Sequence, residues 1–269
     1  MKENCQNCNT LILDNFCSNC GQKSFKRINK KYIVDELQYT IIHTNKGFLY
    51  TLKKLAKNPG KTAREFIEGN RVHHYKPLSL LFILSTISAL LMFKLLDMGS
   101  IMSKLYSDKK MNSMMMTDMY TFMSSYYSLL MMALIPVFAF CTWLILKNWG
   151  QNYYEHIIIN SYVLSFYTLI YIVFIVPILY FLKNSPESFL NVSTFSFILY
   201  VLIYFWFFKG YYPEKSFKEI ALNVVLIFLL IVVAYFAFIL IAMILYMIYF
   251  AIAYSPKELL EYIKPTGKI

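Results

Sequence analysis

The sequence predicts an all-α integral membrane protein: about five transmembrane helices, preceded by basic amphipathic helices and a small cysteine-rich module. Hydrophobic residues make up 58% of the 269 residues and charged residues 15%, whereas about a quarter of a typical soluble domain is charged. Residues 1–76 contain 14 Lys and Arg against 6 Asp and Glu, and so carry +8 of the formal charge of +11. A basic region beside a long apolar one is typical of a chain at an anionic membrane.

Four cysteines form two Cys-x-x-Cys pairs within the first 20 residues, Cys5/Cys8 and Cys17/Cys20. The eight-residue connection can fold back, so the four thiolates can surround one ion as a tetrahedron, which suits Zn²⁺ at about 2.3 Å per bond. We therefore predict a structural zinc ribbon over residues 1–22, in which the metal supplies the folding free energy. Iron of the rubredoxin kind and redox-active thiols are the alternatives.

Residues 23–76 are predicted to form basic amphipathic juxtamembrane helices. Residues 23–31 read as a basic linker that is too polar and too short to pack by itself. Two amphipathic helices follow, broken near residues 45–47, which either pack on the protein itself or lie in the headgroup layer. Asn58-Pro59-Gly60 predicts a turn, and Thr62 with Glu65 predicts a capping box that opens a short helix.

The transmembrane helical domain is predicted over residues 77–254, with a tail at 255–269. Apolar segments of roughly 20 residues can cross a bilayer, and five are found, at about 77–96, 122–146, 157–182, 192–208 and 221–253. The last has neither a charge nor a turn residue and reads as one helix or as a hairpin. As drawn, no span has an ionisable residue in its interior, which argues against an ion-coupled transporter.

The distribution of Lys and Arg predicts the orientation. No apolar run precedes Tyr32, so no secretory signal is recognised, and the dense basic N-terminal flank is expected on the cytoplasmic side of a multi-pass protein in the inner membrane. Five spans then place Lys257, Lys264 and Lys268 outside, against the rule. The larger flank beside the first span is expected to dominate.

Other candidate sites are weaker. Glu155, His156, Asn160 and Ser165 could line a polar cavity at the start of the third span, although helix ends and helix–helix hydrogen bonds explain them equally well. His73 and His74 are expected to anchor the interface. A methionine cluster suits either Cu(I) or apolar packing; its members are Met111, Met114, Met115, Met116, Met119 and Met123. No catalytic residues are recognised.

Several motifs resemble a known family. Phe16-Cys17-Ser18-Asn19-Cys20-Gly21-Gln22, Gly47-Phe48-Leu49-Tyr50-Thr51-Leu52, Asn58-Pro59-Gly60-Lys61 and Arg64 to Pro77 together resemble a bacterial family catalogued as a domain of unknown function. This resemblance covers residues 5–80 and implies a zinc ribbon and several helices, with no activity attached. The order of a Pro-Gly segment, a short helix and about five spans is loosely similar to the Yip family of membrane-trafficking proteins.

The sequence favours a non-enzymatic scaffold or adaptor. Its zinc ribbon and basic helices would bind membrane lipids with anionic headgroups and an unidentified protein partner. Nucleic acid is not favoured, because the knuckle has few aromatic or basic residues at its tips. The alternative function is a transporter or channel for an apolar or lipid-like substrate.

Overall fold

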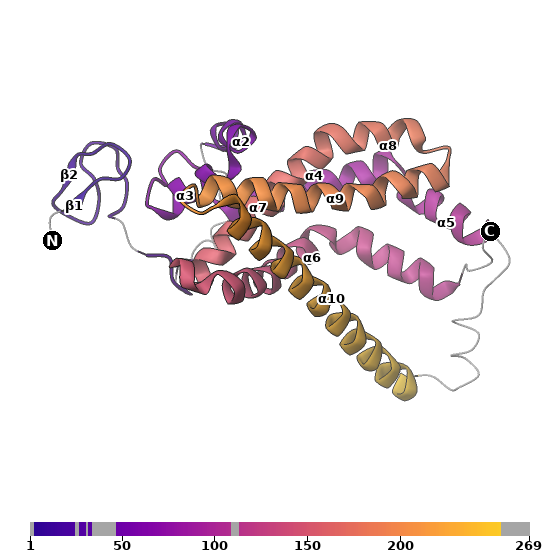
Figure 1. Cartoon of the computed structure of the whole chain (residues 1–269). Helices are drawn as coiled ribbons and strands as arrows, with labels where there is room; N and C mark the ends of the chain where they lie inside the picture. The colour runs from indigo at the N-terminus through magenta and orange to yellow at the C-terminus, as the bar shows by residue number, and fades with distance from the viewer. Residues whose placement is uncertain (1–2, 25–26, 31, 34–46, 109–112, 254–269) are drawn as a thin grey trace.

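The computed structural model describes residues 3–24, 27–30, 32–33, 47–108 and 113–253. A small module at one end of the molecule precedes a bundle of long helices (Figure 1). In the module, β1 (Glu3–Asn4) pairs antiparallel with β2 (Leu11–Ile12), and an isolated bridge joins Phe16 to Lys23.

The rest of the described chain is helical. Its elements are α2 (Phe48–Lys57), α3 (Pro59–Ile67), α4 (Pro77–Leu90), the π-helix η1 (Leu91–Leu95), α5 (Met98–Asp108), α6 (Met114–Leu146), the 3-10 turn η2 (Lys147–Trp149), α7 (Tyr153–Ile170), the π-helix η3 (Tyr171–Ile175), α8 (Val176–Leu182), α9 (Pro186–Tyr211) and α10 (Phe217–Ala253). Within the described residues, five helical segments are long and apolar enough to cross a membrane, at Pro77–Leu95, Thr117–Trp149, Tyr153–Leu182, Pro186–Tyr211 and Phe217–Ala237. The chain is thus a multi-pass membrane protein.

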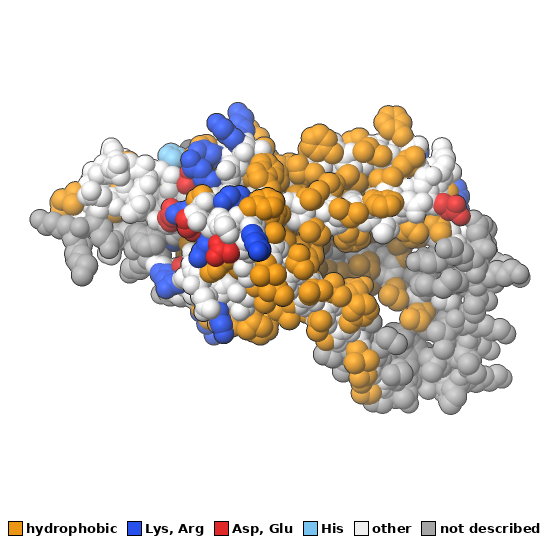
Figure 2. Space-filling model, viewed as in Figure 1, with side chains coloured by type: hydrophobic (Ala, Val, Ile, Leu, Met, Phe, Trp, Pro, Cys, Tyr) orange, Lys and Arg blue, Asp and Glu red, His pale blue; other side chains and the backbone are white. Residues whose placement is uncertain are grey.

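The apolar and charged surfaces are separated along the bundle. A wide apolar band covers the middle of the face in Figure 2, and Lys, Arg, Asp and Glu gather at the end formed by α2 and α3. The apolar side chains of this band are exposed, for example Phe197 at 68% and Phe236 at 64%. A band of this kind would be in contact with lipid tails, whereas the charged end would be in contact with headgroups and water.

The segment at 221–253 is a single helix. α10 runs over 37 residues without a break, which is roughly 55 Å at 1.5 Å per residue. The hairpin alternative is therefore wrong. In Figure 1, α10 starts beside α9 and diverges from it toward its C-terminal end.

The N-terminus of α3 differs from the prediction. Pro59 is the first helical residue, and the side chain of Asn58 caps the helix by accepting a hydrogen bond of 2.9 Å from the Lys61 amide. The Thr62 hydroxyl instead donates to the Asn58 carbonyl at 2.8 Å. The predicted capping box of Thr62 and Glu65 is wrong, because Asn58 is itself a strong cap and proline is favoured directly after it.

Gly60 serves a close helix contact. A Cβ at this position would lie 2.0 Å from the Phe207 carbonyl oxygen, and one at Gly210 would lie 2.4 Å from Asn58 Oδ1. Two glycines thus allow the backbone of α3 to touch the backbone of α9. Ala63 and Phe66 of α3 are also buried in the main core. α3 therefore packs on the protein itself. Of the two amphipathic helices predicted before it, the second is α2, which buries Thr51 and Leu55 and so also packs on the protein, while the first falls mostly outside the described residues.

Candidate metal centre and its attachment to the bundle

The four N-terminal cysteines converge on one point. Their sulfur atoms all lie within 4.8 Å of one another; Cys5 Sγ lies 3.6 Å from Cys20 Sγ, and Cys8 Sγ lies 3.5 Å from Cys17 Sγ. A tetrahedral ion with bonds of about 2.3 Å would hold its sulfur ligands roughly 3.8 Å apart. The distances are much longer than a disulfide bond and match the edges of such a tetrahedron. These four cysteines can bind a metal ion.

The two Cys-x-x-Cys turns share one backbone geometry. The Cys5 amide donates to the Thr10 carbonyl and the Cys17 amide to the Gln22 carbonyl, at 2.9 and 2.7 Å. The fifth residue of each turn, Asn9 or Gly21, has a positive φ of 57° or 71°. Glycine and asparagine tolerate this conformation. The module is therefore a repeated knuckle, each copy supplying two sulfurs.

Hydrogen bonds favour the thiolate form of two ligands. The Thr10 hydroxyl lies 3.3 Å from Cys8 Sγ, and it lowers the pKa of Cys8 to about 6. A contact with the Asn7 side chain lowers the pKa of Cys20, whereas burial raises the pKa of Cys5 to about 11. A metal ion binds the thiolate, so it would deprotonate the buried Cys5 as well. With four sulfurs bound, a tetrahedral ion has no open position for water, which suits a structural role.

The knuckle pair contacts the helical body. The Gln22 side chain amide donates a hydrogen bond to the carbonyl of Gly69, in the turn that ends α3. Gln22 is 5% exposed. A second contact joins Asn7 Nδ2 to His73 Nε2 at 3.5 Å. Both partners lie between α3 and α4, so the module rests on the charged end of the bundle.

The residues after the knuckles, predicted as a basic linker, pack against the helical bundle. Arg27 forms two hydrogen bonds of 3.1 Å with the Glu155 carboxylate and one of 2.7 Å with the Gly150 carbonyl. Ile28 is 1% exposed within the main core, and its carbonyl accepts a hydrogen bond from Asn152. Arg27 and Ile28 attach this segment to the start of α7.

Glu155 therefore has a structural role at the N-terminus of α7. Its carboxylate accepts the Asn152 amide at 2.8 Å, while Asn152 Oδ1 accepts the Glu155 amide at 3.0 Å, which completes a capping box. The side chain of Glu155 is 7% exposed, and that of Arg27 is 58% exposed. The ion pair raises the pKa of Arg27. A buried carboxylate is stable here because both of its oxygens are hydrogen-bonded.

His156 and Asn160 belong to a buried network that joins three helices. Asn160 Nδ2 donates to Thr142 Oγ1 on α6 at 2.8 Å, and Asn160 Oδ1 accepts the hydroxyl of Tyr204 on α9 at 2.7 Å. His156 Nδ1 lies 3.1 Å from the same Thr142 hydroxyl. Ser165, one helical turn further on, is fully buried and has no hydrogen-bond partner among the described residues. The contacts of His156 and Asn160 are those of interhelical hydrogen bonding.

The two adjacent histidines differ in environment. His73 faces the knuckles, whereas His74 is buried against the rings of Tyr50 and Phe66. Glu65 Oε2 lies 3.8 Å from His74 Nε2. Burial of the ring and the charge of Lys54 nevertheless lower the pKa of His74 to about 4. His74 is therefore a neutral core residue.

Sequence reasoning missed Thr142, Tyr204 and Arg27. Thr142 and Tyr204 lie in apolar runs where polar residues carry no periodic signal, and Arg27 reads as one charge among many in a basic stretch. The available signal for Arg27 was its neighbour Ile28, because an apolar residue within a polar run favours a buried site. The methionine cluster is described in part: Met111 lies outside the described residues, while Met119 and Met123 are exposed.

Residues 45–89 match the model of a family described as Protein of unknown function (DUF3667). The matched segment comprises α2, α3 and most of α4, and so contains the Gly60 contact and the Gly69 turn that receives Gln22. It does not include the knuckles, and the zinc ribbon and the likeness to the Yip family stay predictions. No curated protein and no solved structure matches the chain.

Proposed function

We propose that this protein is a non-enzymatic membrane adaptor that holds a zinc-loaded ribbon on the cytoplasmic face of the inner membrane for a protein partner. The observation that carries the proposal is the attachment of the four-thiol module to the bundle at two places, Gln22–Gly69 and Arg27–Glu155. A module held in this way presents its remaining surface in a constant position, which lowers the entropic cost of binding.

The free surface of the module suits a protein partner. Leu13 is 73% exposed and Phe16 is 57% exposed, both in the connection between the two knuckles, and Leu11 beside them is 43% exposed. Exposed aromatic and aliphatic side chains on so small a module are typical of binding sites for proteins. Their separation from the apolar band of the bundle argues that they do not contact lipid tails (Figure 2).

The charged end of the bundle suits the inner surface of an anionic membrane. Most described cations lie in the segments that form this end, and they are Arg27, Lys30, Lys53, Lys54, Lys57, Lys61, Arg64, Arg71, Lys76, Lys147, Lys209, Lys215 and Lys218. At the opposite end the described cations are Lys94, Lys104 and Lys183. This asymmetry supports a cytoplasmic N-terminus, and Lys53 and Lys57 on α2 would contact anionic headgroups at about 1 kcal/mol each.

Photo-crosslinking in cells tests the adaptor proposal. A photoreactive phenylalanine replaces Phe16 in the full-length chain, and the matched control replaces Phe197, which is 68% exposed in the apolar band. We expect a discrete protein adduct at position 16 that is absent at position 197 and lost when Cys17→Ser removes a metal ligand. No adduct at position 16 beyond the control, or an adduct that persists in Cys17→Ser, would refute the proposal.

Reporter fusions test the orientation separately. A reporter that works only in the cytoplasm should be active after residue 76 and after residue 150, and silent after residue 187. The reverse pattern would place the metal module outside the cell and exclude a cytoplasmic partner.

A further inference from the structure

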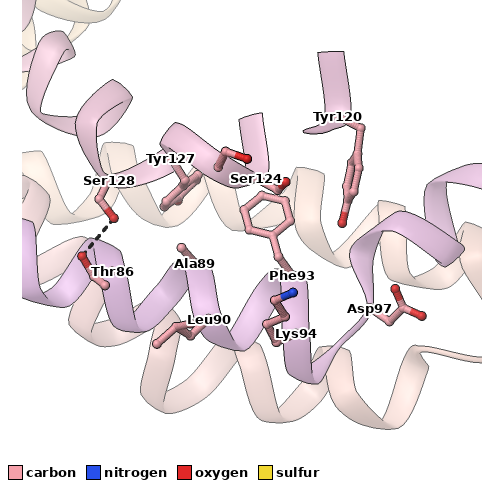
Figure 3. Close-up of a pocket in the computed structure, with 11 residues that line it drawn as sticks. Thr86, Ala89, Leu90, Phe93, Lys94, Asp97, Tyr120, Ser124, Tyr127 and Ser128 are labelled. Atoms are coloured by element: carbon pink, nitrogen blue, oxygen red, sulfur yellow. Dashed lines mark hydrogen bonds between the residues drawn. The ribbon is translucent and has the colours of Figure 1, made fainter. Parts of the chain in front are cut away.

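A cavity of about 470 Å³ lies between α4–η1 and the N-terminal half of α6. Figure 3 shows its labelled side chains, with Lys94 and Asp97 on one wall and Tyr120, Ser124 and Ser128 on the other. The volume lies within the range of about 300–1,000 Å³ common for small-ligand sites. The lining mixes hydroxyl, aromatic and charged groups, which is unusual for a cleft beside lipid.

Lys94 is the cation that lines this cavity. It lies in the π-helix η1, one residue before the end of the candidate span Pro77–Leu95. It is 17 positions after Pro77, or roughly 25 Å of helix, close to the far boundary of a hydrocarbon core of about 30 Å. A lysine at this depth can reach the headgroup layer, and π-bulges are frequent at functional sites.

Neither charge in the cavity is neutralised by a described side chain. The ion pairs among the described residues include neither Lys94 nor Asp97. Asp97 accepts the Ser100 hydroxyl at 2.6 Å. Lys94 and Asp97 both line the cavity, and both are exposed residues. A cation and an anion three residues apart, each with free capacity, would match a ligand that carries both charges.

Exposed apolar side chains lie on the two helices that form the cavity. Leu90 is 57% exposed on α4, and Phe122, Tyr126 and Leu129 are 53%, 49% and 56% exposed on α6. A ligand entering here would keep an apolar part in the bilayer. The Ser125 hydroxyl, from the opposite helix, can donate to an anionic oxygen, whereas the Ser124 hydroxyl donates to the Thr121 carbonyl at 2.9 Å.

We propose that this cavity binds the headgroup of a zwitterionic phospholipid with a primary amine. Lys94 and the Ser125 hydroxyl hold the phosphate, because an ammonium is a strong point charge for phosphate oxygens. Asp97 accepts hydrogen bonds from the ligand ammonium, and the acyl chains lie along the exposed faces of α4 and α6. The site is independent of the adaptor function. Free phosphate shares the anionic chemistry but has neither the amine nor the apolar tails.

Native mass spectrometry of the full-length protein tests the site. Protein in detergent is exposed to phosphatidylethanolamine, phosphatidylcholine, phosphatidylglycerol or inorganic phosphate. We expect one tightly retained phosphatidylethanolamine, weaker retention of phosphatidylcholine, whose quaternary ammonium cannot donate to Asp97, and no retention of inorganic phosphate. Equal retention of all three lipids would overturn the assignment, and so would retention of phosphate alone.

Two variants and a control locate the ligand. Lys94→Gln should weaken phosphatidylethanolamine binding roughly tenfold or more, since it removes a charge-assisted hydrogen bond. Asp97→Asn should abolish the preference over phosphatidylcholine while retaining binding. Lys183→Gln is the matched control: Lys183 lies at the same end of the bundle, over the ring of Tyr180 at 4.4 Å, and its loss should change nothing.

A folding control keeps the result interpretable. Lys94→Arg preserves the charge and should retain the lipid, and all variants should unfold at the same temperature as the wild type when lipid is absent. Equal binding by wild type and Lys94→Gln would refute the site. An equal loss in Lys183→Gln would show that the lysines act through general interfacial charge, and would refute it as well.

Discussion

Arg27→Gln is the substitution that best tests how the metal module is held. In the folded chain the Arg27 guanidinium forms two 3.1 Å hydrogen bonds with Glu155, whose side chain is 7% exposed. Removing the arginine leaves a buried carboxylate with the Asn152 amide at 2.8 Å as its remaining described partner. The free energy lost is therefore that of a buried charge without its counter-ion, which is larger than that of an exposed ion pair.

The size of the effect follows from the exposure of the two partners. Breaking a fully buried pair from one side costs about 3–5 kcal/mol, whereas an exposed pair is worth about 0.2–1 kcal/mol. Arg27 is 58% exposed, so water can partly replace it, and we expect about 2 kcal/mol. That free energy corresponds to a roughly 30-fold increase in the population in which residues 27–33 have detached from α7.

Hydrogen exchange measures this detachment directly. The amides of Tyr32 and Ile33 donate to Asn29, at 3.0 and 3.3 Å, and they should exchange roughly 30-fold faster in Arg27→Gln. Adding Glu155→Gln should recover much of the loss, because the unpaired charge is then absent. Lys30→Gln, an exposed neighbour, is the control and should exchange as the wild type does.

The result that would refute the reasoning is unchanged exchange at Tyr32 and Ile33 in Arg27→Gln. That outcome would mean that Ile28, which is 1% exposed, holds the segment alone. The metal content should equal that of the wild type in either case, because Arg27 contacts no cysteine among the described residues. A loss of metal would show instead that the attachment and the ribbon fold together.

Three further predictions concern the other sites. Metal analysis of protein purified reduced and without chelator should find roughly one zinc per chain, and Cys17→Ser should remove it. The helices should stay inserted in that variant. No zinc in the wild type would refute the site. Burial lowers the pKa of His74 to about 4, so between pH 6.5 and 4 the unfolded chain binds a proton that the folded chain does not. The melting temperature should therefore fall as the pH is lowered from 6.5 to 4. A His74→Gln variant whose melting temperature changes equally steeply with pH would contradict this. Asn160→Leu should lower the free energy of unfolding in detergent by about 1–2 kcal/mol. This loss should be larger than that caused by Tyr204→Phe, because Asn160 forms hydrogen bonds with two other helices. Equal losses in the two variants would refute the shared network.

The class of protein and the four cysteines that can bind a metal ion could be predicted from the sequence, because both depend on local patterns. Long apolar runs predict membrane spans whatever their partners are, and paired Cys-x-x-Cys spacing brings four sulfurs together through short turns. The helices nevertheless begin earlier than the apolar runs predict: α6 starts at Met114 and not near 122, and α9 at Pro186 and not near 192. The polar residues at these ends interrupt the apolar pattern, so the apolar runs do not include them although they are helical.

What the tertiary structure decided is how these parts are joined. Gly60 reads as a turn residue, but it lies in the first turn of α3, where a side chain would collide with the backbone of Phe207 on α9. Arg27 reads as linker charge until Glu155 is seen to lie 128 positions further along the chain and 3.1 Å away. Contacts between distant segments depend on packing that no local pattern records. The sequence by itself therefore determined a membrane bundle with a metal module, and the fold decided that the module is attached to it.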